Sequence, residues 1–181
     1  MINEVWEFNK TFVEKKQYKP FETSKYPDRK LAIVTCMDTR LIELLPAALG
    51  IKNGDAKIIK NAGGVISHPF GSAVRSLLIA IYELGVEDIM IIGHTDCGVQ
   101  HMDADEMMDH MAERGVSRQV MDTMAYCGVD FKTWLSGFDS VEQSVKNSVE
   151  LLKQHPLIPK DVRIYGCVMD SRTGELTNIE V

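Results

Sequence analysis

The stretch LAIVTCMDTR, residues 31–40, decides the fold, because an apolar segment runs directly into a cluster of polar and sulfur-containing side chains. LAIVT at 31–35 is short and continuously apolar, which is typical of a strand buried on both faces of a parallel sheet. Similar runs follow: AKIIK at 56–60, DIMII at 88–92 and VRIYGCV at 162–168. Helical stretches between them fit crossover connections. The sequence predicts an α/β fold with a central, mostly parallel sheet of about four to five strands flanked by helices.

Two of the connecting stretches have clear helical periodicity. The first, residues 69–84, ends at Gly85 and is expected to bury one apolar face, made of Val74, Leu77, Leu78 and Ile81. The second is expected to begin with Asp139 or Ser140 as N-cap and to end at the His155-Pro156 step. Residues 101–137 are less periodic, and they predict short helices joined by loops.

The first thirty residues, 1–30, are expected to stand apart from a single catalytic α/β domain formed by residues 31–181. They open with apolar side chains at helical spacing, namely Val5, Phe8, Phe12 and Val13. A polar segment with two prolines follows, which is typical of an arm lying over a surface. We expect an amphipathic helix and an arm that pack on a partner subunit.

Composition narrows the range of functions. The chain has 181 residues and a net charge of -6 without a basic stripe, which argues against nucleic acid and anionic membranes as partners. No apolar run reaches the roughly 20 residues that span a bilayer, and the first residues lack the order of a signal peptide. A cytoplasmic protein is therefore expected. Four cysteines in such a chain favour metal binding or catalysis over a disulfide framework.

Three clusters of chemically active residues follow three of the predicted strands: CMDTR at 36–40, NAGG at 61–64 and GHTDCG at 93–98. In open parallel sheets, ligands bind beyond the carboxyl ends of the strands. Clusters that are distant in the sequence can therefore converge on one site.

Cys36, His94 and Cys97 offer two thiolates and one imidazole, which is a ligand set for a catalytic zinc with its fourth position open. Asp38 lies two positions after Cys36 in an extended segment, so both side chains leave the backbone on the same side and both can face one metal. The Arg40 guanidinium can hold the Asp38 carboxylate bidentately. Two states remain open: Asp38 paired with Arg40, which leaves the fourth position free, or Asp38 on the zinc, which closes it.

The motifs CMDTR, NAGG and GHTDCG, in this order, resemble the signature of β-class carbonic anhydrases. The resemblance runs from Leu31 through Gly98 and includes MDSRTGEL at 169–176. It implies one Zn²⁺ per chain on Cys36, His94 and Cys97, with Asp38 as a possible further ligand. It also implies an Asp38-Arg40 catalytic dyad, and Gly63 and Gly64 with their backbone close to the site.

The activity that this resemblance implies is reversible hydration of carbon dioxide to bicarbonate by zinc-bound hydroxide. Asp38 would orient that hydroxide and Arg40 would hold Asp38 in place. The resemblance further implies a homodimer or a higher homo-oligomer, in which the N-terminal helix embraces the neighbouring subunit.

Other interpretations compete with this one. The same zinc site could act on carbon disulfide or carbonyl sulfide, and a non-catalytic, zinc-stabilised bicarbonate-binding protein could keep the fold without turnover. The remaining cysteines, Cys127 and Cys167, are expected to be structural. His101, His110 and His155 are expected at the surface.

Overall fold

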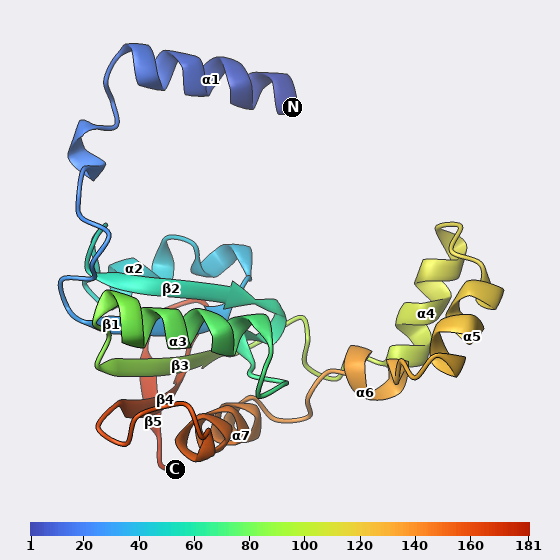
Figure 1. Cartoon of the computed structure of the whole chain (residues 1–181). Coiled ribbons are helices and arrows are strands. Elements are labelled where there is room, and N and C mark those ends of the chain that lie inside the picture. The colour runs from blue at the N-terminus through green and yellow to red at the C-terminus, as the bar shows by residue number, and fades with distance from the viewer.

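The four predicted strands and a fifth, short one lie side by side in one sheet (Figure 1) in the computed structural model, which describes residues 1–181. The order is β2-β1-β3-β4-β5, in which the first four are mutually parallel and β5 runs antiparallel to β4. The strands are β1 (Leu31–Cys36), β2 (Ala56–Asn61), β3 (Asp88–His94), β4 (Arg163–Met169) and β5 (Leu176–Ile179). The expected α/β class and mostly parallel sheet are confirmed.

The register of the strands aligns their carboxyl ends. Cys36 ends β1 opposite Asn61, and His94 ends β3 opposite Met169. The Thr35 hydroxyl donates a 2.9 Å hydrogen bond to the carbonyl oxygen of Ile92, which ties β1 to β3 directly before the polar clusters. This end of the sheet therefore places the loops after β1, β2 and β3 together.

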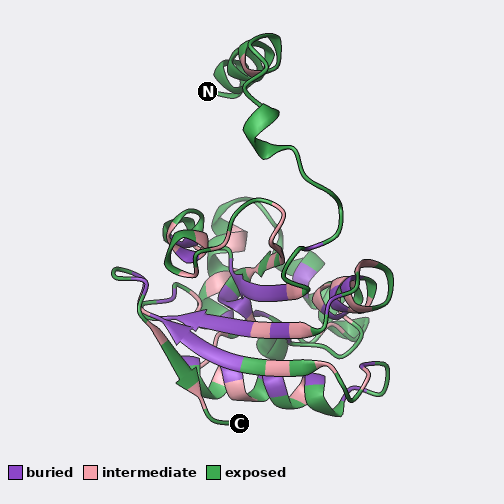
Figure 2. Cartoon of the chain, turned by 90° about the vertical axis from the view of Figure 1, so that its left-hand side faces the viewer, coloured by how far each residue is buried: buried purple, intermediate pink, exposed green.

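Two helices cover one face of the sheet, and a shorter layer covers the other. Helices α3 (Ser72–Leu84) and α7 (Val141–Gln154) pack against strand side chains such as Val34 and Ile91. Helix α2 (Leu44–Ala48) and a 3₁₀ turn at Thr39–Leu41 pack against Ile33 and Ile92, which point the other way. The central strands are therefore largely buried (Figure 2), as their continuous apolar runs predict.

Helix α7 packs directly on β3 and β4. Its N-cap is Ser140, whose hydroxyl accepts a hydrogen bond from the backbone N–H of Gln143. A Cβ atom added to Gly166 of β4 would lie 2.8 Å from a methyl group of Val145. The absence of a side chain at this position lets the helix settle against the sheet.

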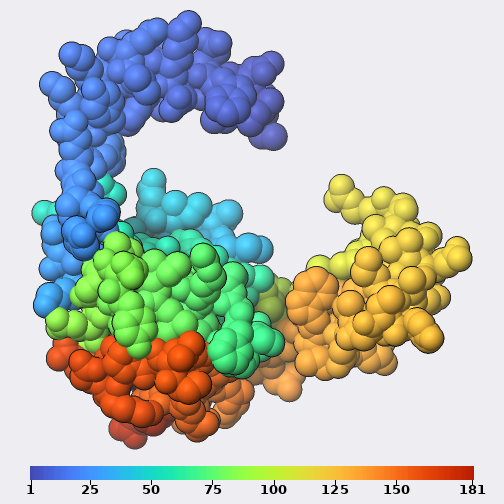
Figure 3. Space-filling model, viewed as in Figure 1, coloured from blue at the N-terminus to red at the C-terminus, as the bar shows by residue number.

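Residues 101–137 form an arm of three short helices that projects from the sheet (Figures 1 and 3). They are α4 (Ala104–Glu113), α5 (Arg118–Tyr126) and α6 (Phe131–Leu135). Each begins with a side-chain cap, from Asp103, Ser117 and Asp130 respectively. The chain leaves and rejoins the body at one point, where Gln100 and Phe138 form an isolated bridge.

The N-terminal helix α1 (Ile2–Glu14) also stands away from the body (Figure 3) and buries none of its residues. A 3₁₀ turn at Lys19–Phe21 and an extended segment connect it to β1. No helix in the structure has both the length and the apolar character needed to cross a membrane.

Two expectations about single residues were wrong. His155 is buried, not at the surface: its Nε2 lies 2.8 Å from the carbonyl oxygen of Pro69, and its Nδ1 accepts a hydrogen bond from the Leu157 N–H. His155 has extended backbone where α7 ends, and both nitrogens of its buried ring find backbone partners. Cys127 is exposed at the end of α5 and has no packing role, whereas Cys167 is buried.

Candidate metal centre

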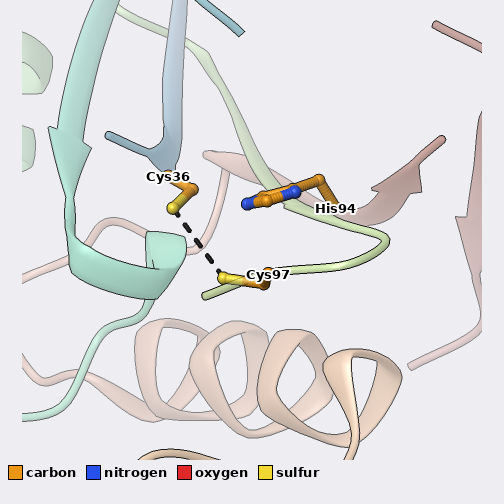
Figure 4. Close-up of side chains that lie close together, drawn as sticks. All are labelled: Cys36, His94 and Cys97. Carbon is orange, nitrogen blue, oxygen red and sulfur yellow. Dashed lines mark hydrogen bonds between the residues drawn. The ribbon is translucent and has the colours of Figure 1, made fainter. Parts of the chain in front are cut away.

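The three predicted zinc ligands come together at the carboxyl end of the sheet (Figure 4). Cys36 and His94 are the last residues of β1 and β3, and Cys97 lies in the loop after β3. Their ligand atoms all lie within 4.8 Å of one another, and the two sulfurs are 3.9 Å apart. All three side chains are buried. The parallel register thus brings together residues that are far apart in the sequence.

His94 provides the test of whether a metal fits. Its Nδ1 lies 2.9 Å from the backbone carbonyl oxygen of Thr95, so Nδ1 carries the proton and donates it there. Its Nε2 is buried without any hydrogen-bond partner. A buried nitrogen beside two sulfurs and without a hydrogen-bond partner is what a metal-binding histidine presents. The hydrogen bond from Nδ1 fixes the tautomer and leaves the lone pair of Nε2 free for a metal. Two sulfurs and one nitrogen fit zinc.

The pKa values of the two thiols in the cluster are shifted in opposite directions. Burial acts to raise the pKa of the Cys36 thiol, but His94 and the backbone N–H groups of Asp38 and Gly63 together outweigh it and lower the pKa to about 7. Burial raises the pKa of the Cys97 thiol. Cys36 is therefore the thiol that ionises first, and thiolate is the form that binds metal.

Asp38 pairs with Arg40 and not with the cluster. The Arg40 Nε donates to Asp38 Oδ1 at 3.0 Å, and an Arg40 terminal nitrogen donates to Oδ2 at 2.8 Å. This bidentate hydrogen bonding holds the pKa of the Asp38 carboxyl well below its usual range. Asp38 Oδ2 still lies only 3.9 Å from His94 Nε2. Of the two states that the sequence left open, the structure has the paired one.

The glycine pair lies against the end of β1. Gly64 has a φ of +65°, and a Cβ atom there would lie 2.8 Å from the backbone nitrogen of Cys36. Gly63 also has a positive φ, and its Cβ would touch Val65, Val99 and Phe138, with Phe138 nearest at 3.0 Å. Gly64 therefore permits close backbone contact with a ligand-bearing residue, and Gly63 faces an apolar wall.

Sequence reasoning did not single out several neighbours of the centre. Asp96 accepts a 2.7 Å hydrogen bond from Arg40, and the Thr95 hydroxyl accepts one from the backbone N–H of Ser171. Asp96 stands inside GHTDCG and Ser171 inside MDSRTGEL, so both could have been found by asking which side chains orient the ligands and the dyad. Phe138 could not be found in this way, because it lies in no such motif and follows the projecting arm of residues 101–137.

Fold and site together define a zinc enzyme of the α/β type, with a Cys-His-Cys centre at the carboxyl end of a parallel sheet. The family model described as carbonic anhydrase matches residues 31–176. The chain therefore belongs to the carbonic anhydrase family, and to its β class.

Individual relatives agree with this assignment. The chain is 49% identical over 176 residues to the Bacillus subtilis protein named "Putative carbonic anhydrase YtiB", covering 97% of this chain and 94% of the relative. The crystal structure of β-carbonic anhydrase isoform I from Trichomonas vaginalis matches with a TM-score of 0.88 and 36% identity, over 99% and 97% of the two chains. A carbon disulfide hydrolase of Acidithiobacillus thiooxidans is 32% identical over 158 residues, 82% of this chain and 76% of the relative.

Proposed function

We propose that this β-class carbonic anhydrase converts carbon dioxide and water to bicarbonate and a proton, reversibly, at a zinc ion held by Cys36, His94 and Cys97. The observation that carries the proposal is the buried His94 Nε2, which has no hydrogen-bond partner and lies within 4.8 Å of two free thiols. When bound there, zinc supplies Lewis acidity, which lowers the pKa of a water molecule in its fourth position.

Asp38 is the residue that we propose to orient the attacking water. Its side chain is 15% exposed, and both carboxylate oxygens accept hydrogen bonds from Arg40, while Oδ2 also lies 3.9 Å from His94 Nε2 at the edge of the cluster. In this position the Asp38 carboxylate would accept a hydrogen bond from the water, which would direct a lone pair of the water oxygen toward the carbon atom of the substrate. Arg40 keeps the carboxylate ionised, and an ionised carboxylate can only accept hydrogen bonds.

Val65, Val99 and Phe138 are the side chains that we propose to receive carbon dioxide. All three approach Gly63, which follows β2 beside the cluster. An apolar wall suits carbon dioxide, which is linear and uncharged. The polar contacts of the site are then left to Asp38 and Arg40.

The proposal is tested by pairing metal analysis with a carbon dioxide hydration assay. The wild-type protein should hold about one zinc ion per chain, and Cys36→Ala should lose most of the metal together with the activity. Cys127→Ala is the matched control, because Cys127 is exposed at the end of α5 on the projecting arm and is not part of the Cys-His-Cys cluster. A fully loaded wild-type protein that hydrates carbon dioxide no faster than buffer would refute the proposal.

Carbon disulfide is the second candidate substrate, and the similarity to the Acidithiobacillus hydrolase favours it. Carbon disulfide is linear and electrophilic at carbon, as carbon dioxide is, so the same centre could attack it. The two candidates are separated by measuring hydrogen sulfide release from carbon disulfide alongside bicarbonate formation on the same sample. We rank carbon dioxide first because the more similar relatives carry the name carbonic anhydrase.

We also propose that α1 packs on a second copy of this chain. The helix leaves the body (Figure 1) with its apolar side chains exposed, among them Val5, Trp6 and Phe8. Val5→Glu combined with Phe8→Glu should reduce the mass measured by sedimentation to that of one chain. Lys10→Glu, also in α1, is the control and should leave the mass unchanged. A wild-type protein that sediments as a monomer would refute this proposal.

A further inference from the structure

Arg40 is held on two sides by two different loops. Toward Asp38 it makes the bidentate contact described above, within the segment after β1. Toward the loop after β3, one of its terminal nitrogens donates to Asp96 Oδ2 at 2.7 Å, and the other donates to the backbone carbonyl oxygen of Asp96, also at 2.7 Å. The guanidinium thus has one carboxylate facing the metal cluster and another facing solvent.

The backbone of Asp96 is shaped for this contact. Its φ is +54°, in the left-handed region that costs free energy in residues other than glycine and that aspartate adopts more readily than most. Asp96 lies between the ligands His94 and Cys97, so the turn that carries the two ligands also presents the Asp96 carbonyl oxygen to Arg40. The same turn therefore both holds Arg40 and positions two of the metal ligands.

Asp96 makes no contact with the cluster itself. Its side chain is 85% exposed, and its carboxylate forms an ion pair with Arg40, from which it accepts a hydrogen bond. Exposed ion pairs contribute little singly, but a guanidinium fixed between two carboxylates belongs to the networks that do contribute. The effect of Asp96 must therefore pass through the orientation of Arg40.

We propose that Asp96 is a positioning residue that fixes the direction of Arg40 and thereby keeps Asp38 paired and off the metal. The proposal rests on the proposed function, because it assigns Asp38 its place in that reaction. Without Asp96, Arg40 is free to swing toward solvent. Asp38, whose Oδ2 lies 3.9 Å from His94 Nε2, is then close enough to become a fourth ligand.

Asp96→Gly is the most informative variant, because glycine keeps the left-handed backbone and the carbonyl contact and removes only the side chain. We expect kcat to fall about two- to tenfold with a smaller change in KM. Asp96→Asn, which retains a side-chain acceptor without the charge, should recover part of the loss. Asp109→Asn, which removes another aspartate-arginine contact on the projecting arm, is the control and should match the wild type.

A second readout does not depend on turnover. In protein loaded with cobalt(II) in place of zinc, thiocyanate should change the visible spectrum when the fourth position is open, and much less when Asp38 occupies it. We expect Asp96→Gly to weaken this response at equal cobalt content and equal melting temperature. A wild-type spectrum and wild-type kcat in Asp96→Gly would overturn the proposal, as would a loss of activity that follows only from lost metal or lost stability. An inactive wild type would refute the proposed function, while the cobalt spectrum would still test Asp96.

Discussion

Gly64 combines two requirements that no other residue type meets together. Its backbone is left-handed, and the space where a Cβ would stand is occupied by the backbone of Thr35 and Cys36. Backbone atoms of a central strand cannot move aside as the end of a flexible side chain can. The glycine after β2 is therefore needed for β1 to present Cys36 at this point.

Gly64→Ala should destabilise the protein by roughly 3 kcal/mol or more and reduce its zinc content, since the clash adds to the cost of the left-handed backbone. Gly85→Ala is the matched control: Gly85 has a similar φ of +72°, but open space surrounds the place of its Cβ. It should cost only about 1 kcal/mol. Urea unfolding of both variants measures the difference, and equal costs would show that the close contact with Cys36 is unimportant.

Among the elements, α7 shows how glycines set the spacing of a layer. Gly93 on β3 and Gly166 on β4 both face valines of α7, and a Cβ on either would lie within 3 Å of a valine methyl. Gly93 immediately precedes the ligand His94. The position of α7 and the position of a metal ligand are therefore adjusted by neighbouring residues of one strand.

Gly166→Ala should destabilise the fold by about 1–3 kcal/mol, because the added methyl overpacks the contact with Val145. Val145→Ala makes room for that methyl. The double variant should therefore be more stable than the sum of the two single losses predicts, as denaturant unfolding in a double-mutant cycle would reveal. Strict additivity would contradict the packing described here.

At the opposite end of the sheet, Asp88 and Arg163 join β3 to β4 through two hydrogen bonds of 2.5 and 2.6 Å. Arg163 lowers the pKa of the Asp88 carboxyl. A carboxyl whose pKa is lower in the folded than in the unfolded state stabilises the fold above its unfolded pKa, and this stabilisation is lost as pH falls through the folded value. Asp88→Asn should thus lower the urea midpoint at pH 7, and the difference from wild type should shrink below about pH 4. A difference that is independent of pH would contradict the ionic origin.

Particular elements show how far the sequence carried the prediction. β1 to β4 and α3 were recognisable because each buries a continuous or periodic apolar pattern, and the ligands followed from their place after strands. β5 and α2 were missed: β5 has four residues with polar side chains among them, and α2 has five residues including a proline. Neither is long enough to show periodicity. Asp96 was not singled out, although it stands inside GHTDCG, because its partner Arg40 lies 56 positions away in the sequence.

For the molecule as a whole, the metal is expected to contribute directly to stability. Its ligands belong to β1, β3 and the loop after β3. An ion that binds only the folded chain stabilises that chain by a free energy that grows with the logarithm of its affinity. Removing zinc with a chelator should lower the melting temperature by roughly 8 °C or more. Cys36→Ala should melt at the same temperature with and without the chelator. If the wild type showed no shift on verified loss of zinc, the centre would not bridge the strands as described.

The bridge between Gln100 and Phe138 separates the projecting arm from the rest of the chain. The backbone N–H of His101 donates to the carbonyl oxygen of Phe138, and the backbone N–H of Gly137 donates to that of Met102. These hydrogen bonds join, at the root of the arm, the two segments that connect it to the body. We therefore expect insertions or deletions beyond that root to leave the position of Cys97 unchanged. The length and sequence of this projecting arm can therefore change while the geometry of the metal centre is preserved.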